Sequence, residues 1–173
     1  MKILTHYGRK PSETFVSDYP VARDNGHNPG GLWVSDDSDY GWTAFVQDRL
    51  FQVSAYWVKA RDRWHYKYDF IIDPAQAGRI LVPATPKELA EFTSTYSEAS
   101  PRECVADGRA GYGIHIDWQR MKADYKGILI SPYQQELSYL NGDPAFHWYR
   151  FDCACGCFWD ISSLVPVPGS CRP

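Results

Sequence analysis

Two short segments near the start of the sequence carry side chains suited to holding a ligand. The first, Lys2 to Gly8, is a β-prone run with His6 near its end. The second, Gly30 to Trp42, starts as an apolar strand and runs into a helix with further aromatic residues. An imidazole, hydroxyl groups and flat rings at neighbouring strand ends form hydrogen bonds and stacking contacts. We therefore expect a cleft that takes a planar ring and a sugar.

A sheet is needed to bring these two segments together, and the order of the predicted elements provides one. Runs of β-branched and aromatic residues alternate with a few short helical patterns, which predicts an α+β fold with a split, mostly antiparallel sheet. At 173 residues the chain is long enough for a sizeable core, and we predict a single domain over residues 1–173. The predicted strands cover residues 2–7, 31–35, 52–59, 64–72, 79–83, 127–131, 146–152 and 158–162.

Helix starts are marked by capping residues. The segment Thr85-Pro86-Lys87-Glu88 places a cap, a proline at the first helical position and a capping-box glutamate in the expected order. The helix that begins near Trp42 has Ser38 or Asp39 available as its cap. By contrast, residues 97–113 are polar and contain several glycines, so this stretch is predicted to be irregular.

Composition and charge narrow the classes of partner. The net charge of −3 and the pI of about 5.9 give no support for non-specific binding to nucleic acid. The sequence has no apolar run of signal-peptide or membrane-spanning length, so we expect a soluble, cytoplasmic protein without a membrane partner. Aromatic residues make up 16% of the chain, which is more than a core of this size needs. Some of the rings should therefore line a cleft or an interface.

The cysteines are predicted to be free thiols. Three of them alternate in Cys153-Ala-Cys155-Gly-Cys157, and alternate strand residues point to the same face in a geometry that suits a disulfide poorly. Their spacing also differs from the usual Cys-x-x-Cys zinc knuckle, and a fourth ligand would have to come from Cys104, Cys171 or a histidine. Buried thiols that pack a tight turn are the simpler interpretation, and no metal site is assigned.

The N-terminal segments resemble the ADP-ribosyltransferase fold, in the branch of diphtheria toxin and the poly(ADP-ribose) polymerases, which includes compact phage-encoded effectors. The shared features are a first-strand histidine near a glycine and the later strand Gly31-Leu-Trp-Val-Ser35. In that branch the glycine follows the histidine directly, whereas Tyr7 separates His6 from Gly8 in this chain. Residues 125–133, 147–152 and 156–159 also resemble uncharacterised viral and phage proteins.

This resemblance implies that NAD is bound and consumed as a substrate. His6 would hold the adenosine-side ribose and so serve both binding and catalysis. The backbone of Tyr7 and Gly8 would grip the nicotinamide carboxamide, which Ser35 would also contact. The ring that stacks on the nicotinamide would be one of Trp33, Tyr40 or Trp42.

The resemblance also requires a carboxylate on a late strand. An ionised oxygen near the ribose stabilises the positive charge that develops as nicotinamide leaves. Glu136 lies just past a predicted strand in Gln134-Gln-Glu136, and Asp152 ends a strand beside the cysteine and glycine segment. Spacing in the sequence leaves both open, and we favour Asp152.

Structural roles compete with each of these assignments. A histidine such as His6 on a strand is often a satisfied structural residue, and Trp33 alternates with core positions. A carboxylate such as Glu136, just past a strand, is most often a loop residue exposed to solvent. Two classes of function therefore remain. The first is a transferase that passes ADP-ribose to a macromolecule, a protein in preference to a nucleic acid, in the host cytoplasm if the protein is phage-encoded. The second is a non-catalytic phage-type inhibitor that binds a host protein or sequesters a nucleotide signal in the same cleft.

Overall fold

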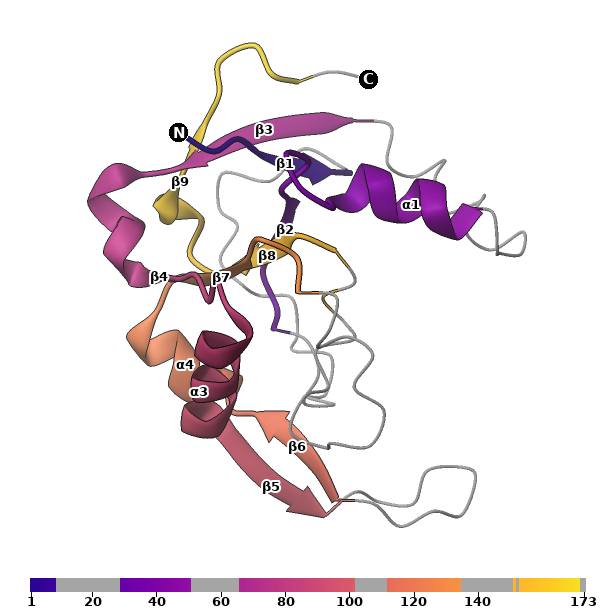
Figure 1. Ribbon diagram of the computed structural model, residues 1–173. Helices are drawn as coiled ribbons and strands as arrows, with labels where there is room; N and C mark the ends of the chain where they lie inside the picture. Colours follow the sequence, from indigo (N-terminus) through magenta and orange to yellow (C-terminus); the bar gives the residue numbers. More distant parts are fainter. Residues whose placement is uncertain (9–28, 51–65, 102–111, 135–150, 152, 172–173) are drawn as a thin grey trace.

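The described part of the chain is built on one curled sheet of seven strands (Figure 1). The computed structural model describes residues 1–8, 29–50, 66–101, 112–134, 151 and 153–171. All neighbouring strands run antiparallel except the two at one edge of the sheet, which are parallel to each other. In sheet order the strands are β4 (Ile80–Leu81), β7 (Gly127–Ile130), β8 (Cys155–Phe158), β2 (Leu32–Ser35), β1 (Leu4–Tyr7), β3 (Lys67–Ile72) and β9 (Leu164–Pro166).

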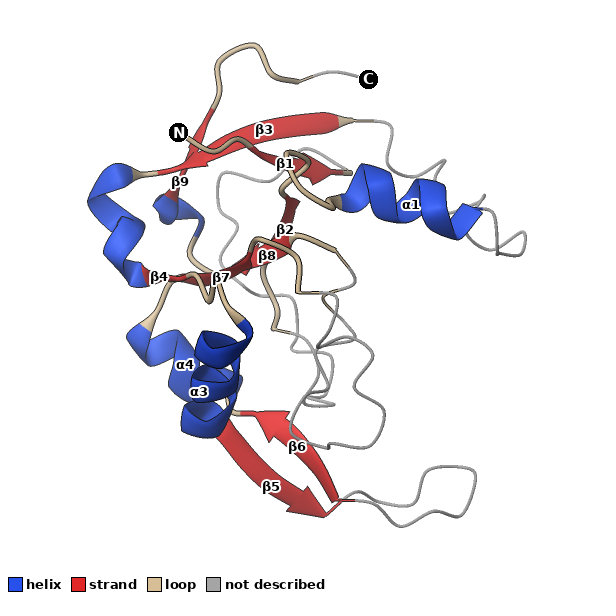
Figure 2. Cartoon of the chain, viewed as in Figure 1, coloured by secondary structure: helices blue, strands red, loops and turns tan. Residues whose placement is uncertain are grey.

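Short helices and a second, two-stranded sheet complete the fold, as Figure 2 shows. The α+β class and the mostly antiparallel sheet predicted from the sequence are confirmed. Within the described residues, no helix is both long and apolar enough to span a bilayer. The remaining elements are α1 (Trp42–Leu50), α3 (Pro86–Tyr96), α4 (Trp118–Asp124), the 3₁₀ turns η1 (Pro74–Arg79) and η3 (Ile161–Ser163), and the paired strands β5 (Ser97–Pro101) and β6 (Tyr112–Ile116).

One apolar cluster explains why the large sheet curls. It joins Ile80 on the edge strand β4 to Leu164 on the opposite edge strand β9. Both edges of a seven-stranded sheet reach one cluster only if the sheet bends around it. Phe158, which is fully buried, lies in this cluster, and burying a side chain of this size contributes about 1.5–3 kcal/mol. Leu4, Leu32, Val34, Phe70 and Leu129 complete the cluster, which we call the inner core.

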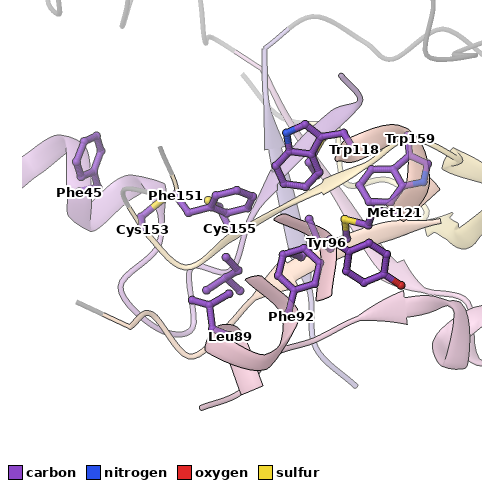
Figure 3. Packing of buried hydrophobic residues seen from close by; sticks show 13 residues of the cluster. Phe45, Leu89, Phe92, Tyr96, Trp118, Met121, Phe151, Cys153, Cys155 and Trp159 are labelled. Carbon is purple, nitrogen blue, oxygen red and sulfur yellow. The ribbon is translucent and has the colours of Figure 1, made fainter. Parts of the chain in front are cut away.

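The opposite face of the sheet is covered by helices and forms a second, outer core (Figure 3). Helix α3 begins with the predicted capping box: the Thr85 hydroxyl accepts from the Glu88 amide, and the Glu88 carboxylate accepts from the Thr85 amide at 3.0 Å. The buried residues of this core are Phe45, Leu89, Phe92, Tyr96, Trp118, Met121, Ile128, Ile130, Phe151, Cys153, Cys155, Cys157 and Trp159.

Three local predictions are wrong. Residues 97–113 were predicted to be irregular, yet Ser97–Pro101 forms β5, which pairs antiparallel with β6, and β6 begins at Tyr112 within the same stretch. The cysteines do not form a turn between strands, because Cys155 and Cys157 lie within β8 itself. No strand was predicted beyond residue 162, yet Leu164–Pro166 forms the edge strand β9 against β3. In each case pairing with a distant segment decides the structure, which local propensity does not report. The predicted strand 52–59 lies outside the described residues.

Candidate functional site

The candidate site lies where β1 and β2 part. The two strands pair at one position, Thr5 opposite Ser35, whereas β1 pairs with β3 over its whole length. The ladder between β1 and β2 therefore does not extend to Tyr7 and Gly8. Gly8 has a φ of 145°, in a region that favours glycine, and its amide donates to the Tyr66 carbonyl at 3.0 Å. The backbone at the end of β1 is thus hydrogen-bonded on the β3 side.

The pleat separates the predicted site residues into two groups. Successive strand residues face opposite sides of a sheet, so Tyr7 lies on the same face as Ser35 and Trp33. His6 falls on the other face, which it shares with Leu4, and the centroid of its ring lies 6.4 Å from that of Tyr68. The sequence predicted that the side chains of His6, Trp33 and Ser35 meet. The strand register instead places the His6 side chain on the other face of the sheet.

His6 nevertheless contacts β2 through the backbone. Its Nδ1 lies 2.8 Å from the Trp33 carbonyl oxygen. A carbonyl only accepts, so Nδ1 carries the proton in this contact, which fixes the tautomer of the neutral ring. The imidazole donates to a carbonyl of β2 just beyond the one position at which β1 and β2 pair. His6 thereby orients the two strands where they part.

Tyr7 and Ser35 converge on a carboxylate that the sequence analysis did not assign. The Tyr7 hydroxyl donates to Asp37 Oδ2, and the Ser35 hydroxyl donates to Asp37 Oδ1 at 2.7 Å. Thr43, in the first turn of α1, adds its hydroxyl 2.8 Å from that of Tyr7. The Ser35 hydroxyl also accepts from the Trp42 amide at 2.6 Å. Residues of β1, β2 and α1 are thus tied into one partly exposed group, the Asp37 network.

The predicted caps of α1 are replaced by this arrangement. Ser38 donates its hydroxyl to Asp36 at 2.5 Å, and Asp39 accepts from the Tyr133 amide at 2.6 Å. The amide of Trp42 is bonded instead by Ser35, seven residues earlier, and this leaves the side chain of Asp37 beside the start of the helix. A carboxylate in this position is favoured by the helix dipole.

Next to this network lies a closed group of charges around Asp36. The Asp36 side chain is fully buried, and its Oδ2 lies 2.5 Å from both the Lys2 ammonium and the Ser131 hydroxyl. Lys2 also donates to Ser131 at 2.6 Å, and Ser38 bonds Oδ1 through its amide and hydroxyl. Burial alone would raise the pKa of Asp36, but the hydrogen bonds from Lys2, Ser131 and Ser38 outweigh it and lower that pKa. We call this group the Asp36 cluster.

The Asp36 cluster contains the residue types of an activated serine, but its charges do not suit that chemistry. A lysine that activates serine must be neutral, whereas Lys2 is paired with an ionised carboxylate. A carboxylate whose pKa is lowered is also a weak base. Ser131 is 5% exposed. The cluster therefore neutralises a buried charge and fixes the turn at residues 36–39.

The three candidate stacking rings each already face another ring. Trp33 lies 5.1 Å from Phe151 between centroids, and Tyr40 stacks on Tyr133 at 5.1 Å with a 22° angle. Trp42 contacts Phe45 at 5.4 Å. All three are partly buried against the outer core, and each has some accessible surface. The three rings therefore pack against the core, and a ligand would contact them only through the part of their surface that stays accessible.

Both candidate carboxylates, Asp152 and Glu136, lie outside the described residues. The residues on either side of Asp152 are described, and Phe151 and Cys153 both belong to the outer core that Trp33 packs against. Cys155, three positions later, pairs with Ser35 of β2. Phe151, whose ring contacts that of Trp33, therefore lies beside β2, the strand that carries Ser35.

The Tyr7 hydroxyl and the Cys157 thiol are held in their neutral forms. Burial, followed by the hydrogen bond to Asp37, raises the pKa of the Tyr7 hydroxyl well above its usual range. Burial likewise raises the pKa of the Cys157 thiol. The described cysteines Cys153, Cys155, Cys157 and Cys171 are free thiols, and no three metal-ligating side chains gather anywhere in the described ranges.

Sequence reasoning missed Asp37, Asp36 and their partners for different reasons. The run Asp36-Asp37-Ser38-Asp39 was visible as an acidic turn, but nothing in it separates the buried carboxylate from the exposed one. Lys2 and Ser131 lie 129 positions apart and share no motif. Comparison with protein-family models, with curated proteins and with solved structures gave no match. The site is therefore interpreted from its own geometry.

Proposed function

We propose that the protein has an ADP-ribosyltransferase-like fold and binds NAD where β1 and β2 part. It would break the nicotinamide–ribose bond and pass ADP-ribose to a macromolecule, a protein in preference to a nucleic acid. In this proposal it is a phage-type effector that acts in the cytoplasm of a host. The observation that carries the proposal is the gathering of Tyr7, Gly8, Ser35 and Asp37 at one junction of β1, β2 and α1.

The geometry revises which residue of β1 faces the ligand. Tyr7, directly before Gly8, shares its face with Ser35, and His6 does not. We therefore assign to Tyr7 the ligand-facing position of β1, and to His6 the positioning of β2 through the Trp33 carbonyl. The backbone of Tyr7 and Gly8 would hold the carboxamide through groups other than the Gly8 amide, which already donates to the Tyr66 carbonyl. One of Trp33, Tyr40 or Trp42 would lie against the nicotinamide ring.

The chemistry needs one ionised oxygen beside the ribose. As the bond from C1′ to the nicotinamide nitrogen breaks, its electron pair leaves with the nicotinamide and positive charge develops on the sugar. Asp152 would stabilise that charge, because the chain on both sides of it packs in the core behind Trp33. Glu136 remains the second candidate. An acceptor nucleophile then bonds C1′ from the opposite side and loses its proton.

The direct test is release of nicotinamide from NAD by the full chain, measured by chromatography. Asp152→Asn keeps the shape of the side chain and removes the charge, so we expect release to fall by about 100-fold or more. Glu136→Gln is measured in parallel. Glu91→Gln is the matched control, because Glu91 lies exposed on α3 and its change should leave release unaltered. Equal rates in Asp152→Asn and the wild type would remove Asp152 from the reaction.

The same assay decides between the transferase and the nucleotide-sequestering alternative. Calorimetry reports whether NAD binds, independently of whether it is cleaved. Binding together with nicotinamide release supports the transferase. Tight binding with no release under any condition supports sequestration, and the absence of both rejects this site for NAD.

A further inference from the structure

Lys67 is a cation at the edge of the candidate site whose role the fold alone does not explain. It is the first residue of β3, directly opposite Tyr7, the last residue of β1. Its ammonium lies 5.3 Å from the centroid of the Tyr7 ring. A lysine over a tyrosine face is held there by a cation–π interaction. Lys67 therefore lies beside the end of β1, next to the position that Gly8 follows.

The partners of Lys67 differ from those of three other lysines. Lys2, Lys87 and Lys126 each pair with a carboxylate, at 2.5, 3.8 and 2.8 Å respectively. Lys67 has no such ion pair with any carboxylate among the described residues. Its charge is thus held in place by a ring and not neutralised by an acid. This arrangement leaves the ammonium suited to an anionic ligand.

Tyr7 separates a positive end of the site from a negative end. Its hydroxyl donates to Asp37, and Lys67 lies over its ring. Sugar hydroxyls are donors that a carboxylate accepts, whereas phosphate oxygens are acceptors that an ammonium binds. A nucleotide lying along Tyr7 would therefore place a ribose toward Asp37 and phosphate toward Lys67.

We propose that Lys67 binds the pyrophosphate of a dinucleotide and makes the site select phosphate-bearing ligands over nucleosides. This inference rests on the proposed function for its choice of NAD and ADP-ribose. Lys67 is distinct from the backbone proposed to hold the carboxamide and from the proposed catalytic carboxylate. Binding of phosphate by Lys67 can be measured whether or not the protein cleaves NAD.

The test is equilibrium binding of ADP-ribose and of adenosine to the full chain, measured by calorimetry. Lys67→Met removes the charge and keeps much of the apolar length, so the dissociation constant of ADP-ribose should rise about tenfold or more while that of adenosine stays the same. Lys67→Arg should retain most of the affinity. Lys87→Met makes the same charge change on α3, at an exposed position, and should leave both constants unaltered.

Several outcomes would overturn the proposal. Equal ADP-ribose affinity in Lys67→Met and the wild type would do so, as would equal weakening of ADP-ribose and adenosine, or no ADP-ribose binding by the wild type. Nicotinamide release is measured in the same preparations. Release with no effect of Lys67→Met would reject this inference and keep the transferase. Binding of ADP-ribose that depends on Lys67, without release, would keep the phosphate site and reject the transferase.

Discussion

Asp36 and Asp37 are neighbours in the sequence, yet they occupy opposite kinds of environment. Asp36 is 0% exposed and is surrounded by the ammonium of Lys2 and the hydroxyls of Ser131 and Ser38. Asp37 lies at the surface and accepts from neutral hydroxyls of β1, β2 and α1. The first carboxylate has its charge neutralised inside the fold, and the second presents its charge to solvent.

Because of this difference, the two aspartates should contribute to different properties of the protein, Asp36 to stability and Asp37 to ligand binding. A buried carboxylate with an ion-pair partner contributes to the fold only while both partners remain. An exposed carboxylate bonded to hydroxyls loses less when it is changed and can exchange its partners for those of a ligand. We therefore expect changes at Asp36 to act mainly on folding, and changes around Asp37 to act mainly on nucleotide binding.

The largest effect should come from Asp36→Ala. This change leaves the Lys2 ammonium and two hydroxyls without their shared acceptor, and we expect a loss of about 3 kcal/mol in the free energy of unfolding. Urea titration followed by circular dichroism measures it, with Glu91→Gln as the control. A loss below about 1 kcal/mol would show that the Asp36 cluster contributes little to the fold.

A smaller effect should appear on acidification. The pKa of folded Asp36 lies below that of the unfolded chain, which is about 3.9. The ionised carboxylate therefore stabilises the fold above that value, and this contribution is lost as the pH falls through the folded-state pKa. The difference in unfolding free energy between the wild type and Asp36→Asn should stay constant down to about pH 5 and shrink as the pH falls below about 4. Parallel curves for the two proteins would contradict the assignment.

The smallest effect on stability should come from Tyr7→Phe. The Tyr7 hydroxyl bonds Asp37 and Thr43 at a partly exposed position, so its removal should cost about 0.5–1 kcal/mol in unfolding free energy. If the proposed function holds, Tyr7→Phe should weaken NAD binding, measured by calorimetry, by more than it lowers the unfolding free energy, because Tyr7 is the proposed ligand-facing residue of β1. A Tyr7→Phe protein with wild-type affinity for NAD and lowered stability would place Tyr7 with the Asp36 cluster as a structural residue.

The elements with strong local signals were predictable from the sequence. The capping box at Thr85 and Glu88 fixes the start of α3 because both of its bonds lie within four residues. The strands around Thr5 and Val34 follow from short runs of β-prone residues. In contrast, β5 and β9 have weak propensity and exist because a partner strand supplies their hydrogen bonds.

The candidate site was predictable only in part. The two segments do lie together, and Tyr7 and Ser35 share one network. The face on which His6 lies was not predicted, because a single position along a strand reverses the direction of a side chain. The role proposed for Lys67 depends on its pairing with Tyr7, sixty positions earlier, which no local pattern records.

By itself, the sequence determined the fold class, the α3 cap and the two segments that meet at the site, because propensity and capping act over a few residues. The tertiary structure decided which aspartate is buried, which face each strand residue takes and which cation lies beside Tyr7. These depend on strand register and on contacts between residues far apart in the chain, such as Lys2 with Ser131. Their energies arise only when the folded chain removes the charges from water or holds them at its surface.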